Sequence, residues 1–137
     1  MSYLLDTNVL SEWRKPTPDP GVVAWLGQAP LDELFISVIT IGEIRRGISK
    51  LQLRKDHRQA AAYESWLRTT KELFGDRLVP IGVEAAEEWG HSDAGSPVSM
   101  ADGLIAATAK VRGWTVVTRN VADFRGAGVR LLNPFAC

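Results

Sequence analysis

Short apolar runs typical of buried strands alternate with helical segments along this chain, and this alternation limits its possible folds more than any other feature. The expected strands cover residues 3–5, 34–37, 78–81, 114–118 and 129–132. The expected helices cover residues 7–14, 22–26, 41–53, 55–74, 83–90 and 100–112. Helical crossovers return the chain to the same end of a sheet, so the strands that they join run parallel. The pattern therefore predicts an α/β fold around a parallel sheet.

Length and composition narrow the class of protein. The chain has 137 residues, which favours a single domain over residues 1–137. Its 16 basic and 16 acidic side chains balance, so only a local patch could recruit a polyanion. The one cysteine, Cys137, allows no disulfide within the chain, as expected in a reducing cytoplasm. No apolar run approaches the roughly 20 residues of a membrane span, and the N-terminus resembles a strand rather than a signal peptide. We therefore expect a cytoplasmic protein that does not contact a membrane.

Four acidic residues lie in apolar sequence where a strand or a turn gives way to a helix: Asp6, Glu43, Asp102 and Asp123. Asp6 follows the first strand directly, and Asp123 follows the 114–118 strand after a short turn. Glu43 and Asp102 are expected to start helices. In open parallel sheets, ligand sites form beyond the carboxyl ends of the strands, where helices also begin. We therefore expect the four carboxylates to meet at one rim of the sheet.

Carboxylates in apolar surroundings are costly to bury unless something compensates their charge. A helix cap or an arginine can compensate one acid, but four acids at equivalent points are most simply compensated together by a divalent cation. Carboxylate oxygens suit Mg²⁺ or Mn²⁺. The acids therefore predict a metal site and favour metal-assisted phosphodiester chemistry. The two histidines form no metal-binding pair and no Ser-His-Asp set, which disfavours zinc hydrolysis.

Each acid also has a purely structural interpretation. These are a capping box at Thr40-x-x-Glu43, its shorter analogue at Ser99-x-x-Asp102, a helix N-cap at Asp6 and an Asx turn at Asp123. The structural and metal-binding roles are compatible, because a helix N-terminus favours the ionised carboxylate that a metal requires. Short polar residues at the same rim are either donors that orient the carboxylates or caps and turn formers: Thr7, Asn8, Thr118 and Asn120.

A basic stretch over residues 45–58 holds six basic residues and one acid. Its first members, Arg45, Arg46 and Lys50, are the candidates for contact with an RNA backbone. Such a patch would bind phosphates and lose affinity as the salt concentration rises. The alternative is a solvated helical face with no ligand.

Four segments together resemble a known family: Leu-Leu-Asp-Thr-Asn-Val-Leu at 4–10, Ser-Val-Ile-Thr-Ile-Gly-Glu-Ile-Arg-Arg-Gly at 37–47, Ala-Asp-Gly-Leu-Ile-Ala-Ala-Thr-Ala at 101–109 and Thr-Arg-Asn-Val-Ala-Asp-Phe at 118–124. In this order they resemble the PIN-domain ribonucleases, and within them the VapC-type toxins of bacterial toxin–antitoxin pairs, FitB-like branch. The resemblance extends to the Asn-Pro-Phe at 133–135. It implies one PIN domain, a three-layer α/β/α sandwich with a central, mainly parallel sheet.

The resemblance further implies an endoribonuclease dependent on Mg²⁺ or Mn²⁺, with Asp6, Glu43, Asp102 and Asp123 as its acidic quartet. Asp6 and Asp102 match the firmest metal-ligand positions, and Asp123 matches the most variable one. The family also implies a homodimer and a cognate VapB-type antitoxin, through which alone the pair would contact DNA. Because water rather than the ribose 2′-hydroxyl would attack, the expected products carry a 5′-phosphate and a 3′-hydroxyl.

Two other functions stay open. Asp6 at a strand end suits an aspartyl-phosphate mechanism, although Asn8 stands where that chemistry has a second acid. A metal-stabilised module that binds RNA or protein without cutting would use the same acids. The substitution Asp6→Asn or Asp102→Asn separates this module from a nuclease, because a nuclease loses cleavage and keeps binding.

Overall fold

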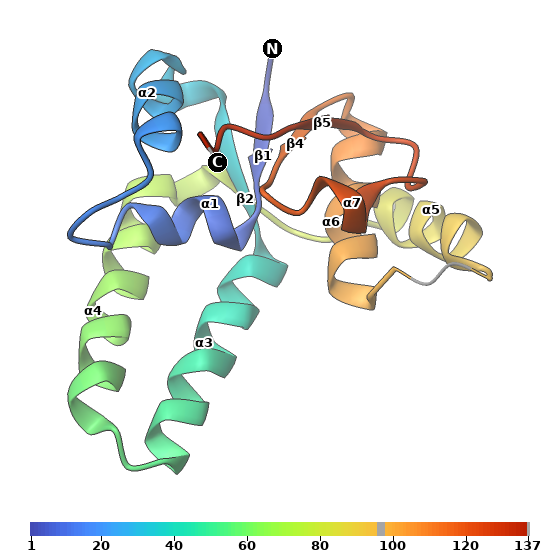
Figure 1. Ribbon diagram of the computed structural model, residues 1–137. Coiled ribbons are helices and arrows are strands. Elements are labelled where there is room, and N and C mark those ends of the chain that lie inside the picture. The colour runs from blue at the N-terminus through green and yellow to red at the C-terminus, as the bar shows by residue number, and fades with distance from the viewer. Residues whose placement is uncertain (96–97, 137) are drawn as a thin grey trace.

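The computed structural model describes residues 1–95 and 98–136, so Cys137 lies outside the described residues. Its centre is a five-stranded sheet in the order β3-β2-β1-β4-β5 (Figure 1). The strands are β1 (Tyr3–Leu5), β2 (Leu34–Ser37), β3 (Leu78–Val79), β4 (Thr115–Val117) and β5 (Arg130–Leu132). Every neighbouring pair is parallel, so the predicted parallel sheet is confirmed.

Helices cover both faces of this sheet. They are α1 (Thr7–Glu12), α2 (Pro20–Gln28), α3 (Val38–Leu53), α4 (His57–Phe74), α5 (Val83–Asp93), α6 (Met100–Arg112) and α7 (Val121–Phe124). Short 3-10 turns, Leu31–Glu33 and Gly75–Arg77, precede β2 and β3. Residues of α1 to α4 share one core with the sheet, and residues of α6 and α7 share the other. These layers confirm the predicted α/β/α sandwich.

The strands supply side chains to both cores, because successive residues of a strand point to opposite faces. Leu5 and Val117 belong to the core formed with α1 to α4. Leu4 and Val116 belong to the core formed with α6, where they meet Ile105. A parallel sheet covered on both faces requires such continuous apolar runs. These runs are the reason that the strands could be predicted from the sequence.

Helix α3 begins earlier than predicted. Its first residue is Val38, and the Ser37 hydroxyl caps it by accepting the Ile39 N–H at 3.0 Å. Ser37 also ends β2, so no loop separates the strand from the helix. Thr40 is buried inside the first turn, and the predicted capping box at Thr40 is therefore wrong. Glu43 lies in the second turn of α3 rather than at its start.

Two other boundaries have local causes. Ser99 caps α6, since its hydroxyl accepts the Asp102 N–H at 3.2 Å, as the spacing predicted. The third strand ends at Val79 rather than at residue 81, because Pro80 has no N–H for a neighbouring strand.

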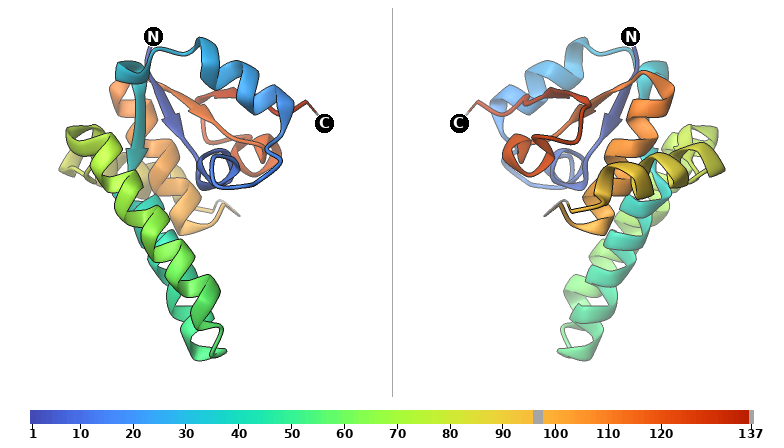
Figure 2. Two further views of the ribbon diagram at one scale, coloured as in Figure 1. Left: turned by 90° about the vertical axis from the view of Figure 1, so that its left-hand side faces the viewer. Right: turned by 90° about the vertical axis from the view of Figure 1, so that its right-hand side faces the viewer.

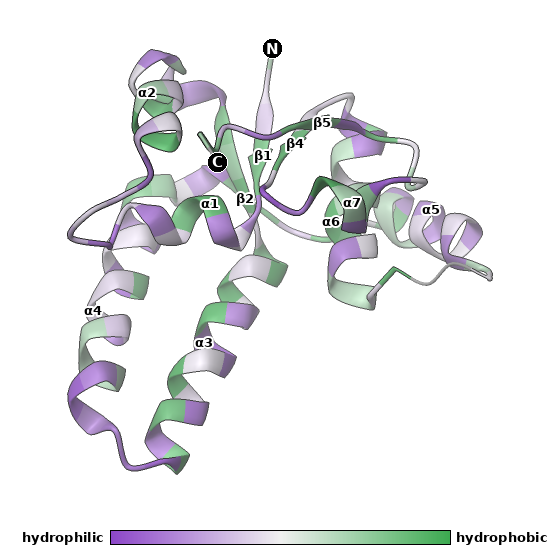
Figure 3. Cartoon of the chain, viewed as in Figure 1, coloured by the Kyte–Doolittle hydropathy of each residue, from purple (hydrophilic) through white to green (hydrophobic). Residues whose placement is uncertain are grey.

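Helices α3 and α4 extend together beyond the sheet as a two-helix arm (Figure 2). Buried side chains of both helices, such as Ile48 and Leu67, belong to one hydrophobic cluster. The connection between the two helices is hydrophilic, and it carries the end of the basic stretch (Figure 3). Among residues 1–95 and 98–136, no helix has the length and apolar character needed to span a membrane.

Candidate active site

The strand order reverses between β1 and β4. Strands β2 and β3 follow β1 on one side of it, and β4 and β5 lie on the other side. Crevices beyond the carboxyl ends of strands at such a switch point are the usual ligand sites of open α/β sheets. Asp6 follows β1 here, and its amide donates to the Val117 carbonyl at 2.9 Å. The topology thus places the first predicted site residue where a ligand site is expected.

The carboxylate of Asp6 is buried, with 5% exposure, and three donors orient it. Oδ1 accepts the Thr7 N–H at 2.9 Å. Oδ2 accepts the Thr118 hydroxyl at 2.8 Å and the Asn8 side-chain amide at 3.2 Å. Asp6 is also the N-cap of α1. The structural interpretation of Asp6 is therefore confirmed, and it leaves an oriented carboxylate at the rim.

Glu43 reaches the same place from α3. Its Oε1 accepts the Thr7 hydroxyl at 2.8 Å, while the Thr7 backbone N–H binds Asp6. Thr7 therefore joins the first turn of α1 to the second turn of α3. The predicted role of Thr7 as a donor that orients carboxylates agrees with both contacts.

The other predicted polar residues form a small network around Thr118. Asn8 donates to Thr118 Oγ1 at 3.3 Å and accepts the Arg119 backbone N–H at 3.1 Å. The backbone N–H of Asn120 donates to Thr118 Oγ1 at 3.0 Å. Asn120 therefore contributes through its backbone, and the turn after β4 is fixed against α1.

Asp102 and Asp123 lie in a more open part of the site. Asp102 stands in the first turn of α6, and Asp123 stands on the four-residue helix α7. Together they line a cleft of about 400 Å³, whose other lining residues are Val98, Ser99, Ala122 and Arg125. Asp123 is in a helix rather than an Asx turn.

The four acids influence one another electrostatically. Burial raises the pKa of Asp6 above its ordinary value, and the charge of Glu43 adds to this, while hydrogen bonds led by that of Thr118 oppose it. Burial also raises the pKa of Asp102, and the charges of Asp6 and then Asp123 raise it further. The negative charge of Glu43 thus disfavours ionisation of Asp6, and the charges of Asp6 and Asp123 disfavour ionisation of Asp102. These pairwise influences link Glu43 to Asp6, and Asp6 and Asp123 to Asp102.

These side chains fit a hard divalent cation in chemical type. Across the described residues, no three acidic, histidine or cysteine side chains are arranged to hold a metal unaided. Mg²⁺ is commonly held by only one or two carboxylates, and keeps several waters or binds substrate phosphates as well. Carboxylate oxygens of this kind, in a site that also admits water, match that requirement in chemical type.

The three basic candidates on α3 differ in their surroundings. Arg45 forms a forked ion pair with Glu64 of α4, at 2.6 and 2.8 Å. Arg46 and Lys50 are exposed, and they follow Glu43 by three and seven residues, on the same side of the helix. Arg45 is therefore engaged within the arm, whereas Arg46 and Lys50 lie on the side that carries Glu43.

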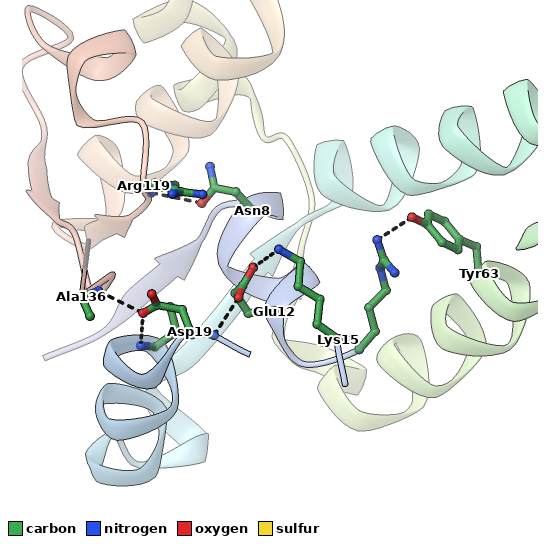
Figure 4. Close-up of polar contacts among 9 residues, drawn as sticks. Asn8, Glu12, Lys15, Asp19, Tyr63, Arg119 and Ala136 are labelled. Carbon is green, nitrogen blue, oxygen red and sulfur yellow. Dashed lines mark hydrogen bonds and ion pairs between the residues drawn. The ribbon is translucent and has the colours of Figure 1, made fainter. Parts of the chain in front are cut away.

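The sequence analysis did not identify a buried acid, Glu12, at the end of α1. Glu12, which is 5% exposed, accepts Lys15 Nζ at 2.5 Å and the Asp19 N–H at 2.9 Å (Figure 4). The Lys15 contact, followed by that of Asp19, holds the pKa of Glu12 below its ordinary value. Asp19 caps α2 and accepts the Ala136 N–H at 3.0 Å. An acid three residues before a lysine was the available signal. The network holds α1, whose first turn carries the site.

Comparison with known proteins agrees with this geometry. The family model described as the PIN domain matches residues 3–128. Toxin FitB of Neisseria gonorrhoeae is 36% identical over 137 residues, which cover 96% of this chain and 97% of that protein. VapC ribonuclease Y4jK of Sinorhizobium fredii is 31% identical, with 96% of each chain covered.

Solved structures give the same result. The crystal structure of FitAcB from Neisseria gonorrhoeae has a TM-score of 0.86 and 34% identity, covering 98% of this chain and 99% of that one. A toxin–antitoxin complex from Klebsiella pneumoniae has a TM-score of 0.71 and 25% identity, covering 99% and 100%. The match of the family model over most of the chain, supported by these relatives, shows that this chain belongs to the PIN-domain family.

Proposed function

We propose that this chain is an endoribonuclease dependent on Mg²⁺ or Mn²⁺ and the toxin of a VapBC-type toxin–antitoxin pair. Three observations support the proposal: Asp6 lies at the switch point of the sheet, Thr7 links Asp6 to Glu43, and Asp102 and Asp123 line one cleft. The names of the relatives, a toxin and a VapC ribonuclease, support it.

Each residue of the proposed site would have a distinct role. Asp6 and Asp102 would hold the cation, and Glu43 and Asp123 would complete its surroundings directly or through water. When bound, Mg²⁺ or Mn²⁺ supplies a water of lowered pKa and neutralises charge on the phosphate. Thr7, Asn8 and Thr118 keep the Asp6 carboxylate in one orientation. Glu43, whose Oε1 accepts the Thr7 hydroxyl, would accept a proton from the attacking water.

The proposed partners follow from the relatives. A toxin of this kind would be neutralised by a cognate VapB-type antitoxin, and the pair would contact DNA through that antitoxin. The solved toxin–antitoxin complex from Klebsiella pneumoniae supports this assembly. We also propose a homodimer, which light scattering of the purified chain would test, and a cytoplasmic location, which fractionation of cells would test.

Cleavage of RNA by the purified, antitoxin-free chain tests the proposal. Total tRNA and rRNA would be incubated with Mg²⁺, with Mn²⁺ or with EDTA, and the ends of the products identified. We expect cuts at discrete sites that leave a 5′-phosphate and a 3′-hydroxyl, require the metal and disappear in Asp6→Asn. The matched control is Asp76→Asn, an exposed aspartate in the turn before β3.

Three results would contradict the proposal. Cuts that survive EDTA or the Asp6→Asn substitution would show that the cleavage does not depend on the proposed metal site. Cyclic phosphate ends would exclude attack by water. RNA binding without cleavage would favour the non-cleaving module, which the lack of a ready three-ligand metal cluster among the described residues also permits.

A further inference from the structure

The arginines of this chain fall into two groups according to the contacts of their guanidinium groups. Members of the first group stack on rings or bind acceptors: Arg14, Arg45, Arg77, Arg112, Arg119 and Arg130. Within the described residues, the guanidinium groups of the others have no hydrogen bond, close ion pair or ring contact: Arg46, Arg54, Arg58, Arg68 and Arg125. All of this second group except Arg125 lie on the arm. Arg125 alone lies at the acidic cleft.

The backbone of Arg125 continues from helix α7, and its side chain is exposed. Its N–H donates to the Ala122 carbonyl at 3.3 Å, and the preceding residue, Phe124, is only 1% exposed in the core. Arg125 lines the cleft of about 400 Å³ that Asp102 and Asp123 also line, but it forms no ion pair with either. The permanent positive charge of Arg125 therefore lies at the cleft without forming an ion pair with Asp102 or Asp123.

We propose that Arg125 binds a phosphate of the RNA strand beside the acidic cleft; this inference rests on the proposed ribonuclease function. RNA that approaches four carboxylates is repelled, so its binding requires positive charge close to them. A guanidinium offers a planar fork of donors that matches two phosphate oxygens.

The surrounding charges support this assignment. Arg46 and Lys50 lie on the α3 side of the quartet with Glu43, whereas Arg125 lies on the α7 side with Asp123. A strand that crosses the acids between α3 and α7 would therefore meet positive charge at both ends of its path. Contacts of this kind position the backbone and carry no base specificity.

The test measures RNA binding without cleavage. The RNA cut by the wild-type chain, labelled with a fluorophore, would be titrated with the Asp6→Asn chain at several KCl concentrations. Arg125→Gln, Arg125→Lys and Arg68→Gln would each be added to that background. Arg68→Gln is the matched control, because it removes the same charge from an exposed position on α4.

We expect Arg125→Gln to weaken binding by roughly tenfold and to reduce the slope of log affinity against log salt by about 0.7, the value for one lost contact on a single strand. Arg125→Lys should keep the slope and bind less tightly than arginine, because an ammonium cannot form the fork. Arg68→Gln should change the slope little. In the chain with an intact Asp6, Mn²⁺ binding measured without RNA should not weaken in Arg125→Gln.

Two results would overturn the inference and leave the proposed function intact. One is a salt slope for Arg125→Gln equal to that of Arg68→Gln. The other is weaker Mn²⁺ binding in Arg125→Gln, which would show that Arg125 organises the acids instead of binding RNA. A wild-type chain that cleaves no RNA would overturn the proposed function, and the inference with it.

Discussion

The two halves of the acidic site are built differently. In the Asp6 half, a buried carboxylate lies just beyond the carboxyl ends of β1 and β4 and accepts hydrogen bonds from Thr7, Asn8 and Thr118. In the other half, Asp102 and Asp123 come from helices and line an open cleft. The contact that fixes Asp102 is the cap between its backbone N–H and Ser99.

The fold alone orients Asp6, whereas Asp102 and Asp123 would be oriented by a bound ligand. The sheet and α1 fix the orientation of Asp6 before any ligand binds. The charge of Asp123 disfavours ionisation of Asp102, and a side-chain hydrogen bond with Ser99 opposes this effect. A cation would stabilise both halves, but its largest effect should be on the second.

The largest effect on stability is expected from Thr118→Val, which removes the closest side-chain donor to the buried Asp6 carboxylate. A lost hydrogen bond to a charged group costs about 1.5–3 kcal/mol. Urea unfolding at neutral pH with a constant slope would measure this cost. The control is Thr108→Val in α6, whose buried hydroxyl only donates to the Leu104 carbonyl within its own helix, at 2.8 Å. Equal losses of stability in the two variants would contradict a special role for Thr118.

A smaller effect of opposite sign is expected from Asp102→Asn in metal-free protein. The folded-state pKa of Asp102 is raised, so folding favours its protonated form below pH 3.8 and loses that contribution as pH rises through the folded-state pKa. At neutral pH the ionised side chain therefore costs stability. Replacing it with neutral asparagine should raise the Tm by roughly 1–2 °C, a few tenths of a kcal/mol.

Two conditions sharpen the test of Asp102→Asn. The advantage should vanish as the pH falls to the ordinary pKa of aspartate, where the wild type is also protonated. Added Mg²⁺ should reverse the order, because the cation favours the ionised wild-type carboxylate. Thermal unfolding across pH, with and without Mg²⁺, measures both. A Tm difference that does not depend on pH would show that charge is not its cause.

The smallest effect concerns the basic residues of α3. Arg46→Gln should reduce the salt slope of RNA binding by about 0.7, as one lost phosphate contact does on a single strand. Arg45→Gln should leave that slope nearly unchanged, because Glu64 already engages the guanidinium of Arg45. A larger change in slope for Arg45→Gln than for Arg46→Gln would refute this division of roles.

Particular residues show how far the sequence predicted the molecule. Asp6 was predictable in both roles, since an acid directly after a buried strand is a helix cap and a rim residue at once. The start of α3 was mispredicted because Ser37 both ends β2 and caps the helix, whereas Thr40-x-x-Glu43 offered a competing cap. The strand pattern predicted that the four acids lie at one rim of the sheet, and the resemblance implied that they form one acidic quartet.

Other features depend on contacts between segments far apart in the chain. Nothing local distinguishes Arg45 from Arg46, because Glu64, which engages Arg45, lies 19 residues away on α4. The Glu12 network depends on where the loop before α2 and the C-terminal segment come to lie. The position of Arg125 at the cleft requires α6 and α7 to be packed together. Spacing in one segment cannot predict such contacts.

The most direct measurement is binding of Mn²⁺ to the RNA-free protein, followed by the electron paramagnetic resonance signal of the free ion. If the four carboxylates form one cation site, the wild type and Asp76→Asn should show saturable binding that both Asp6→Asn and Asp102→Asn lose. Equal binding by all four proteins would contradict the site, because the cation would then be held somewhere other than at these acids.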